Sequence, residues 1–294
     1  MRCWNRSVEP QEAQKKQEVK IKGWAEFFLY SSVFISVCAA AITAETYLLI
    51  YFPINWHYVA FVFFSTLVLY NFPVFFEKNY SAGESERVRW IAENKKLLAG
   101  ISGTALVAAV ILIFFFPFKF ILFFAPIAGV AFAYFFPQTH LRSITGLKAG
   151  IVAFVWTCVA AIYPQLILSD FNFSFGNREG TIILLNFIFL FPLSVIFNVR
   201  DIEADRKAGV KTFPLMYGVK NTIVICLLAL LIFSALVVFS SFATPIKISF
   251  LLAAATAAIL ISAATENRSD HFYVFWIDGL LLLQALLVAL TRIF

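Results

Sequence analysis

Nine long apolar runs dominate this chain of 294 residues and limit what it can fold into. A helix needs about 20 apolar residues to cross the hydrocarbon core of a bilayer. Backbone groups in lipid must be hydrogen-bonded within a helix or a closed barrel, and these runs lack the alternation of barrel strands. We therefore predict an all-α membrane protein of about nine transmembrane helices. The predicted spans are approximately 24–50, 56–76, 97–116, 120–137, 148–168, 181–199, 220–241, 246–264 and 271–291.

The composition supports a location in lipid. Hydrophobic residues make up 61% of the chain and charged residues 14%, against roughly 45–50% and about 25% in soluble domains. A soluble protein of this length has no interior large enough to hide so much apolar surface. We expect a multi-pass integral membrane protein with a charged cytoplasmic tail at residues 1–22 and a single transmembrane domain at 23–294.

The distribution of positive charge predicts the orientation. Nine spans place the N-terminal tail and the loops near 77–96, 138–148, 200–220 and 265–270 on one side, with 19 of the 23 lysines and arginines. Positive charge is retained on the cytoplasmic face, so the N-terminus is expected in the cytoplasm, at a bacterial inner membrane. The net charge of +6 then reflects topology and contact with anionic lipid, not binding of nucleic acid.

One loop carries a pattern typical of metal and phosphate chemistry. Asn198, Asp201 and Asp205 are spaced three and then four apart, so they share one face if the sixth span continues as a helix. Carboxylate and amide oxygens suit a hard divalent cation such as Mg²⁺, and Gly209 allows a sharp exit from the helix. Basic neighbours could hold a diphosphate; they are Arg200, Arg206, Lys207 and Lys211. A solvated loop whose positive charges only set topology is the other interpretation.

Residues 197–218, FNVRDIEADRKAGVKTFPLMYG, closely resemble the second aspartate-rich motif of the UbiA superfamily of intramembrane prenyltransferases. That motif runs DxxDxxxD and is followed by Ala-Gly-Val-Lys-Thr-x-Pro, which is matched here by Lys211, Thr212 and Pro214 among others. The resemblance also extends to the predicted architecture, with polar cytoplasmic loops after spans two and six. It implies a UbiA-type helical bundle.

The resemblance also implies an activity. Family members transfer an isoprenyl chain from a polyprenyl diphosphate to an aromatic or other lipid-soluble acceptor, with Mg²⁺ held between two aspartate motifs. Carried over to this chain, Asp201 and Asp205 are the expected catalytic residues. The expected diphosphate ligands are Arg142, Arg206 and Lys211, and the expected metal ligands are Asn198, Asp201, Asp205, Asn71 and Asn79. Besides these substrates, only membrane lipids are expected partners, and the oligomeric state is left open.

The chain departs from the family in its acidic residues. The first motif of the family reads NDxxDxxxD, and the corresponding place here holds Asn71, Phe72, Phe75 and Asn79; in the second motif Asn198 replaces the first aspartate. At an effective dielectric of about 20, each carboxylate lost about 4 Å from a dication removes several kcal/mol of gross attraction. Two hypotheses follow: a prenyltransferase with a reduced site, or a homologue that binds prenyl diphosphate or lipid without turnover. A transporter ranks third, because the polar residues gather at the cytoplasmic rim and not at the midplane.

A few other polar residues are candidates. Lys148 is either a diphosphate ligand or a cation that sets topology. Asp278 and Glu45 lie inside predicted spans, where ionisable groups are costly and face the bundle interior. For Asp278 we weigh a role near the acceptor against a buried hydrogen bond between helices, the role expected of Gln284.

Overall fold

In the computed structural model, residues 23–75, 86–135, 147–172 and 176–292 are described. Every regular element in these ranges is a helix, which confirms the all-α prediction. The elements are a first helix Gly23–Tyr30, α2 Val33–Leu49, α3 Trp56–Asn71 with a 3₁₀ turn Phe72–Phe75, α4 Glu86–Glu93, α5 Lys95–Ile113, α6 Phe118–Phe135, α7 Leu147–Thr157, a π-helical segment Cys158–Ile162, α8 Tyr163–Leu168, α9 Asn177–Arg200, α10 Ile202–Lys207, α11 Phe213–Phe239, α12 Thr244–Ser262, a π-helical segment Phe272–Ile277 and α13 Gly279–Leu290.

Within the described ranges, seven helices are long and apolar enough to cross a membrane, so the protein is a multi-pass membrane protein by this criterion. An eighth span is present if Gly23–Tyr30 and α2, which meet at an angle of 55°, are counted as one. The apolar helix α6 is shorter than the other candidates. The described part of each of the nine predicted segments is thus mainly helical, but the count of nine spans stays a prediction.

Three of the predicted spans are interrupted. The first breaks at Ser31 and Ser32, where Ser32 has a φ of 67°. The spans Leu147–Leu168 and Phe272–Leu290 each contain a π-helical segment. Such segments occur often at functional sites because they redirect side chains within an otherwise regular helix. Asp278 directly follows the second of them.

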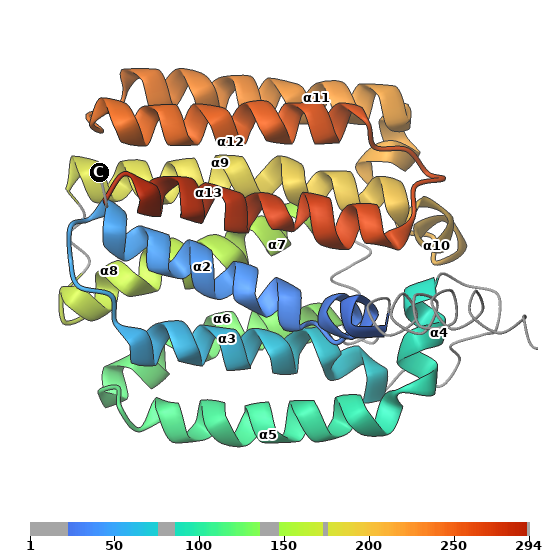
Figure 1. Cartoon of the computed structure of the whole chain (residues 1–294), viewed down its shortest axis with the longest axis horizontal. Coiled ribbons are helices and arrows are strands. Elements are labelled where there is room, and N and C mark those ends of the chain that lie inside the picture. The colour runs from blue at the N-terminus through green and yellow to red at the C-terminus, as the bar shows by residue number, and fades with distance from the viewer. Residues whose placement is uncertain (1–22, 76–85, 136–146, 173–175, 293–294) are drawn as a thin grey trace, which may run out of the picture.

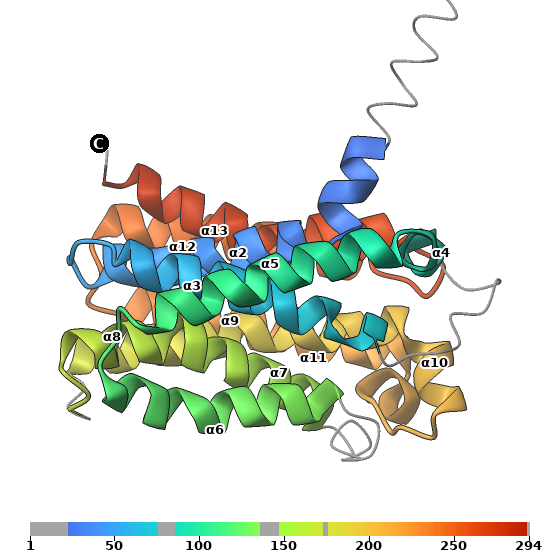
Figure 2. The same cartoon turned by 90° about the horizontal axis from the view of Figure 1, so that it is seen from below.

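The axes of the long helices are roughly aligned, and the short helices α4 and α10 both lie at one end of the bundle, on different sides of it (Figures 1 and 2). We call this the α10 end. Because consecutive helices alternate in direction, the last residues of α3, α6, α9 and α12 and the first residues of α5, α7, α11 and α13 also lie there. The C-terminal end of α13 lies at the opposite end (Figure 1).

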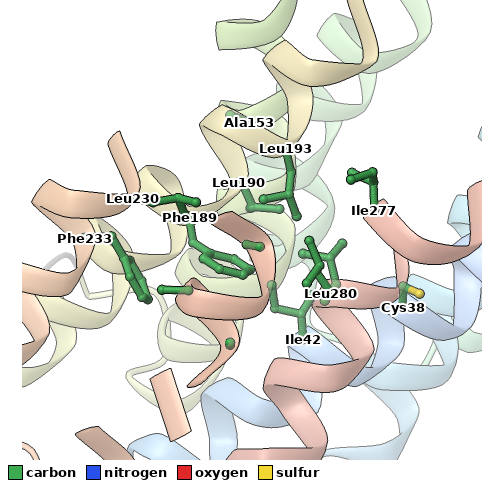
Figure 3. Packing of buried hydrophobic residues seen from close by; sticks show 14 of the residues in the cluster. Cys38, Ile42, Ala153, Phe189, Leu190, Leu193, Leu230, Phe233, Ile277 and Leu280 are labelled. Carbon is green, nitrogen blue, oxygen red and sulfur yellow. The ribbon is translucent and has the colours of Figure 1, made fainter. Parts of the chain in front are cut away.

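The most buried of the seven long helices is α9, which packs against α7 and α11. Its residues Phe189, Leu190 and Leu193 meet Phe233 of α11 and Leu280 of α13 in the main core (Figure 3). Lipid tails are as apolar as these side chains, so close packing and dispersion hold the helices together here. A helix fixed on several sides also fixes the polar residues at its C-terminal end.

Candidate functional site

A cavity of about 720 Å³ opens at the α10 end, and we call it the main cavity. Apolar residues such as Leu69, Val155 and Leu190 line much of it. Charged residues from five segments also line it. They are Arg87 of α4, Lys148 of α7, Arg200 of α9, Asp201 and Asp205 beside and within α10, and Asp278.

A second cavity of about 250 Å³ adjoins the first, and Leu69, Ala131 and Val155 line both. Its wall comes from α3, α5, α6, α7 and the adjoining π-helical segment and is almost wholly apolar, with Ser65 and Thr66 as the polar exceptions. The two cavities together therefore place an apolar space beside a charged one. A ligand with a polar head and an apolar tail matches this division.

The residues of the aspartate pattern line one wall of the main cavity. Helix α9 ends at Arg200 and α10 begins at Ile202, so the predicted continuous helix is interrupted at Asp201. The interruption is small, since the Asp201 carbonyl still accepts from the backbone N–H of Asp205 at 2.8 Å. Asn198, Asp201 and Asp205 all face the cavity, as their spacing predicts.

The end of α10 explains how Asp205 is held in place. Gly209 has a φ of 68°, which favours glycine. The backbone N–H of Val210 donates to the Asp205 carbonyl at 2.9 Å, and that of Gly209 donates to Arg206 at 3.2 Å. These two bonds form a Schellman motif, which closes a helix sharply. The predicted exit at Gly209 is confirmed.

Lys148 lies between the two aspartates. Its Nζ donates to both carboxylate oxygens of Asp205, at 2.8 and 2.9 Å, and lies 3.6 Å from Oδ2 of Asp201. The side chains of Lys148 and Asp205 are 13% and 10% exposed. A buried ammonium needs such partners, because an unpaired charge at this depth is strongly unfavourable.

Arg200 completes a chain of four charges. Its Nε donates to Oδ1 of Asp201 at 2.8 Å, and its guanidinium stacks over Phe197 and Tyr273. The planar guanidinium combines an ion pair with aromatic contact in a way that lysine cannot reproduce. These contacts connect two cations and two carboxylates, which we call the charge cluster: Arg200, Asp201, Lys148 and Asp205.

Asn198 and Asn71 differ in their surroundings. Asn198 is 2% exposed, and its amide Nδ2 has no hydrogen-bond partner within the described ranges. Asn71 is equally buried, but its Oδ1 accepts from Ser32 Oγ at 2.9 Å and its Nδ2 donates to the Ser31 carbonyl at 3.0 Å. Asn71 therefore clamps the break in the first span and is not among the residues that line the main cavity.

The other residues expected at the site lie elsewhere. Arg206 is exposed and pairs with Glu203, and Lys211 is exposed; neither lines the main cavity. Asn79 and Arg142 lie outside the described residues. The structure thus brings Asn198, Asp201 and Asp205 together and leaves the remaining assignments as predictions.

The structure adds residues to the cavity wall that the sequence pattern did not identify. Arg87 lies on the short helix α4, and its backbone N–H lies 3.4 Å from Asp270 Oδ2. Trp156 Nε1 donates to the Tyr70 hydroxyl at 3.1 Å, which joins α7 to α3 across the cavity wall. Asp278 also lines the cavity, and its charge inside an apolar run was the one available signal.

The donor set tests whether Mg²⁺ fits here. Mg²⁺ needs near-octahedral oxygen ligands at about 2.0–2.1 Å. Lys148 Nζ already occupies both oxygens of Asp205 and approaches Asp201. Within the described part of the chain, no group of three or more His, Cys, Asp or Glu residues could hold a metal ion. The described residues do not fit the two-motif metal site of the family, so the expectation of Mg²⁺ rests on the resemblance alone.

Fold and site together define a multi-pass helical membrane protein with a charged, apolar-backed cavity at one end of its bundle. Comparison with known proteins adds no family, since neither a protein-family model nor a curated protein matches the chain. The function is therefore argued from the site itself.

Proposed function

We propose that the protein is a UbiA-type prenyltransferase-like membrane protein. It would transfer an isoprenyl chain from a polyprenyl diphosphate to an aromatic or other lipid-soluble acceptor. The main cavity carries this proposal, because it combines the charge cluster and Asn198 with an adjoining apolar space. An isoprenyl diphosphate has the same division into an anionic head and an apolar tail.

The reaction catalysed at such a site begins with the departure of diphosphate from the isoprenyl chain. The bond between C1 and the diphosphate oxygen breaks, and its electron pair leaves with the diphosphate. The acceptor forms the new bond to C1 and loses a proton, for which Asp278 is the candidate base in the cavity wall. Lys148 and Arg200 would stabilise the charge on the leaving group, and preorganised groups of this kind are the largest source of catalysis in many enzymes.

The proposal includes nine spans, with the bent pair Gly23–Tyr30 and α2 as the first and α6 as the fourth. It also places the α10 end in the cytoplasm of a bacterial cell. The charge distribution supports this orientation, since the opposite end holds only four of the 15 lysines and arginines in the described ranges. A cytoplasmic opening would give a soluble or membrane-borne diphosphate access to the cavity.

The direct test uses purified full-length protein in detergent, farnesyl or geranylgeranyl diphosphate, and a panel of aromatic and other lipid-soluble acceptors. Released diphosphate and prenylated product are measured with Mg²⁺ and with EDTA. We expect product from the wild type and a loss of at least about a hundredfold in Asp201→Asn/Asp205→Asn, because the two carboxylates hold Lys148 and Arg200, the cations that would stabilise the leaving group. The control is Asp170→Asn at the opposite end. Absence of product over the whole panel, or an unaffected double variant, would contradict the enzyme.

A prenyl-diphosphate-binding protein without turnover is the second candidate. The observation that favours it is the replacement of the first aspartate set by Asn71, Phe72, Phe75 and Asn79. It predicts that farnesyl diphosphate raises the melting temperature of the protein while no acceptor yields product. Formation of product from any acceptor would exclude it.

A further inference from the structure

We propose that Lys148 is a built-in cation that takes the place of a divalent metal between Asp201 and Asp205, and that the site holds a phosphate headgroup without metal. The second part rests on the proposed function. The first part concerns the resting protein and stands on the contacts of Lys148.

The geometry of Lys148 is the first support. Its ammonium contacts both oxygens of Asp205 and lies 3.6 Å from Asp201 Oδ2, so it bridges the carboxylates that the family uses for metal. A dication placed between the same carboxylates would lie against this ammonium. The two cations therefore compete for one position, and repulsion between like charges prevents joint occupancy.

The cations already present are the second support. Lys148 lies on Asp205 and near Asp201, and Arg200 pairs with Asp201. A dication bound between the same carboxylates would add two positive charges beside Lys148 and Arg200. Repulsion between like charges opposes such binding in a poorly solvated site.

Donors without a hydrogen-bond partner in the residues that line the cavity are the third support. Asn198 is 2% exposed and its Nδ2 has no partner among the described residues. An ammonium has three N–H donors. Lys148 uses two at hydrogen-bond distance on Asp205, and its contact of 3.6 Å with Asp201 is longer than a hydrogen bond. Donors of Lys148 and Asn198 that have no partner among the described residues match phosphate oxygens, which accept hydrogen bonds, and would repel a cation.

The site is therefore not a metal site that has been weakened by the loss of carboxylates. Two carboxylates orient a lysine, and the lysine together with Asn198 and Arg200 presents donors to an anionic headgroup. In this arrangement Asp205 is a positioning residue for Lys148. The prediction is that divalent metal becomes useful to the protein only when the lysine is removed.

The test titrates Mn²⁺ alone into purified full-length protein and follows the free ion by electron paramagnetic resonance. We expect that the wild type has no Mn²⁺ site that depends on Asp205, so Asp205→Asn should leave its Mn²⁺ binding unchanged. Lys148→Met, which removes the ammonium from Asp205 and from beside Asp201, should gain a site at least tenfold tighter than any in the wild type. Lys119→Met, which frees the exposed Asp170 at the opposite end, is the matched control and should gain none. A tight wild-type site that Asp205→Asn abolishes, or no gain in Lys148→Met, would overturn the proposal.

A second arm measures the melting temperature with farnesyl diphosphate. The wild type should be stabilised equally in EDTA and in Mg²⁺, and Lys148→Met should be stabilised in Mg²⁺ alone. Loss of the wild-type stabilisation in EDTA would overturn metal-free binding. If farnesyl diphosphate stabilises no variant in either buffer, the proposed function fails, and the Mn²⁺ titration still decides the role of Lys148.

Discussion

Two asparagines stand where the resemblance to the UbiA family suggests metal ligands, Asn71 in α3 and Asn198 in α9, and both are 2% exposed. The side-chain oxygen and nitrogen of Asn71 are both hydrogen-bonded to residues at the break in the first span. Asn198 lines the main cavity with an amide nitrogen that has no partner within the described ranges. The two side chains are equally buried, and they differ in their hydrogen bonds.

The difference in hydrogen bonding indicates that the two asparagines have different roles. A buried polar group costs free energy unless it is hydrogen-bonded, so an unpartnered one calls for a ligand or another reason. Asn71 meets that requirement within the fold and fixes the path of the first span. Asn198 lines the cavity and has an amide nitrogen without a partner among the described residues. We therefore expect substitution of Asn71 to change stability and substitution of Asn198 to change binding.

The largest effect should come from Asp205→Ala, which leaves the Lys148 ammonium buried with Asp201 3.6 Å away. Removing one partner of a buried ion pair typically costs about 3–5 kcal/mol. The free energy of unfolding in mixed detergent micelles is the measurement. The double variant Asp205→Ala/Lys148→Met should recover most of the loss, because it removes the unpaired charge as well. If the single variant has the same free energy of unfolding as the wild type, the ion pair between Lys148 and Asp205 does not stabilise the region around Asn198.

The next effect should come from Asn71→Leu, which removes two buried hydrogen bonds and leaves the Ser31 and Ser32 partners unpaired. We expect a loss of about 1–3 kcal/mol in the free energy of unfolding. The affinity for farnesyl diphosphate, measured by thermophoresis in detergent, should stay unchanged in the folded fraction. A stable Asn71→Leu protein that no longer binds the diphosphate would reverse the comparison.

A smaller effect of a different kind is expected for Asn198→Leu. Its amide nitrogen makes no hydrogen bond to a described residue, so the free energy of unfolding should change little. A hydrogen bond to a charged group is worth about 1.5–3 kcal/mol, so the affinity for farnesyl diphosphate should fall about tenfold or more. Unchanged affinity would show that this amide does not contact the ligand.

The smallest effect should come from Lys119→Met at the opposite end of the bundle. Lys119 and Asp170 form an ion pair of 2.9 Å, close to the 2.8 Å of Lys148 and Asp205, but their side chains are 56% and 72% exposed. Exposed pairs contribute about 0–1 kcal/mol. Equal losses from Lys119→Met and Lys148→Met in unfolding experiments would show that burial does not separate the two pairs.

The helices could be predicted from the sequence because apolar runs are local signals, and the described part of each of the nine predicted segments is mainly helical. The breaks could not. The bend at Ser31 and Ser32 is held by Asn71, about forty positions along the chain, and no local pattern contains such a contact. The π-helical segments at Cys158–Ile162 and Phe272–Ile277 likewise lie in apolar runs that give no sign of them.

The site was likewise predictable only where its residues are close together in the sequence. Spacing along one helix was sufficient to place Asn198, Asp201 and Asp205 on one wall. The partner of Asp205 was not, because Lys148 lies 57 positions away on another helix. Arg87 reaches the same cavity from α4, and its place depends on how the helices pack. Chemistry shared between helices is fixed by packing, which a single pattern does not contain.

The central claim is that the main cavity and its apolar extension hold an isoprenyl diphosphate with the headgroup at the charge cluster. Photoaffinity labelling tests it most directly, with a farnesyl diphosphate analogue that carries a diazirine at the tail and mass spectrometry of the labelled peptides. The account predicts labelling of residues shared by the two cavities, such as Leu69 and Val155, abolished by excess unlabelled farnesyl diphosphate and reduced in Asn198→Leu. Labels spread over lipid-facing positions such as Phe239, without competition, would contradict it.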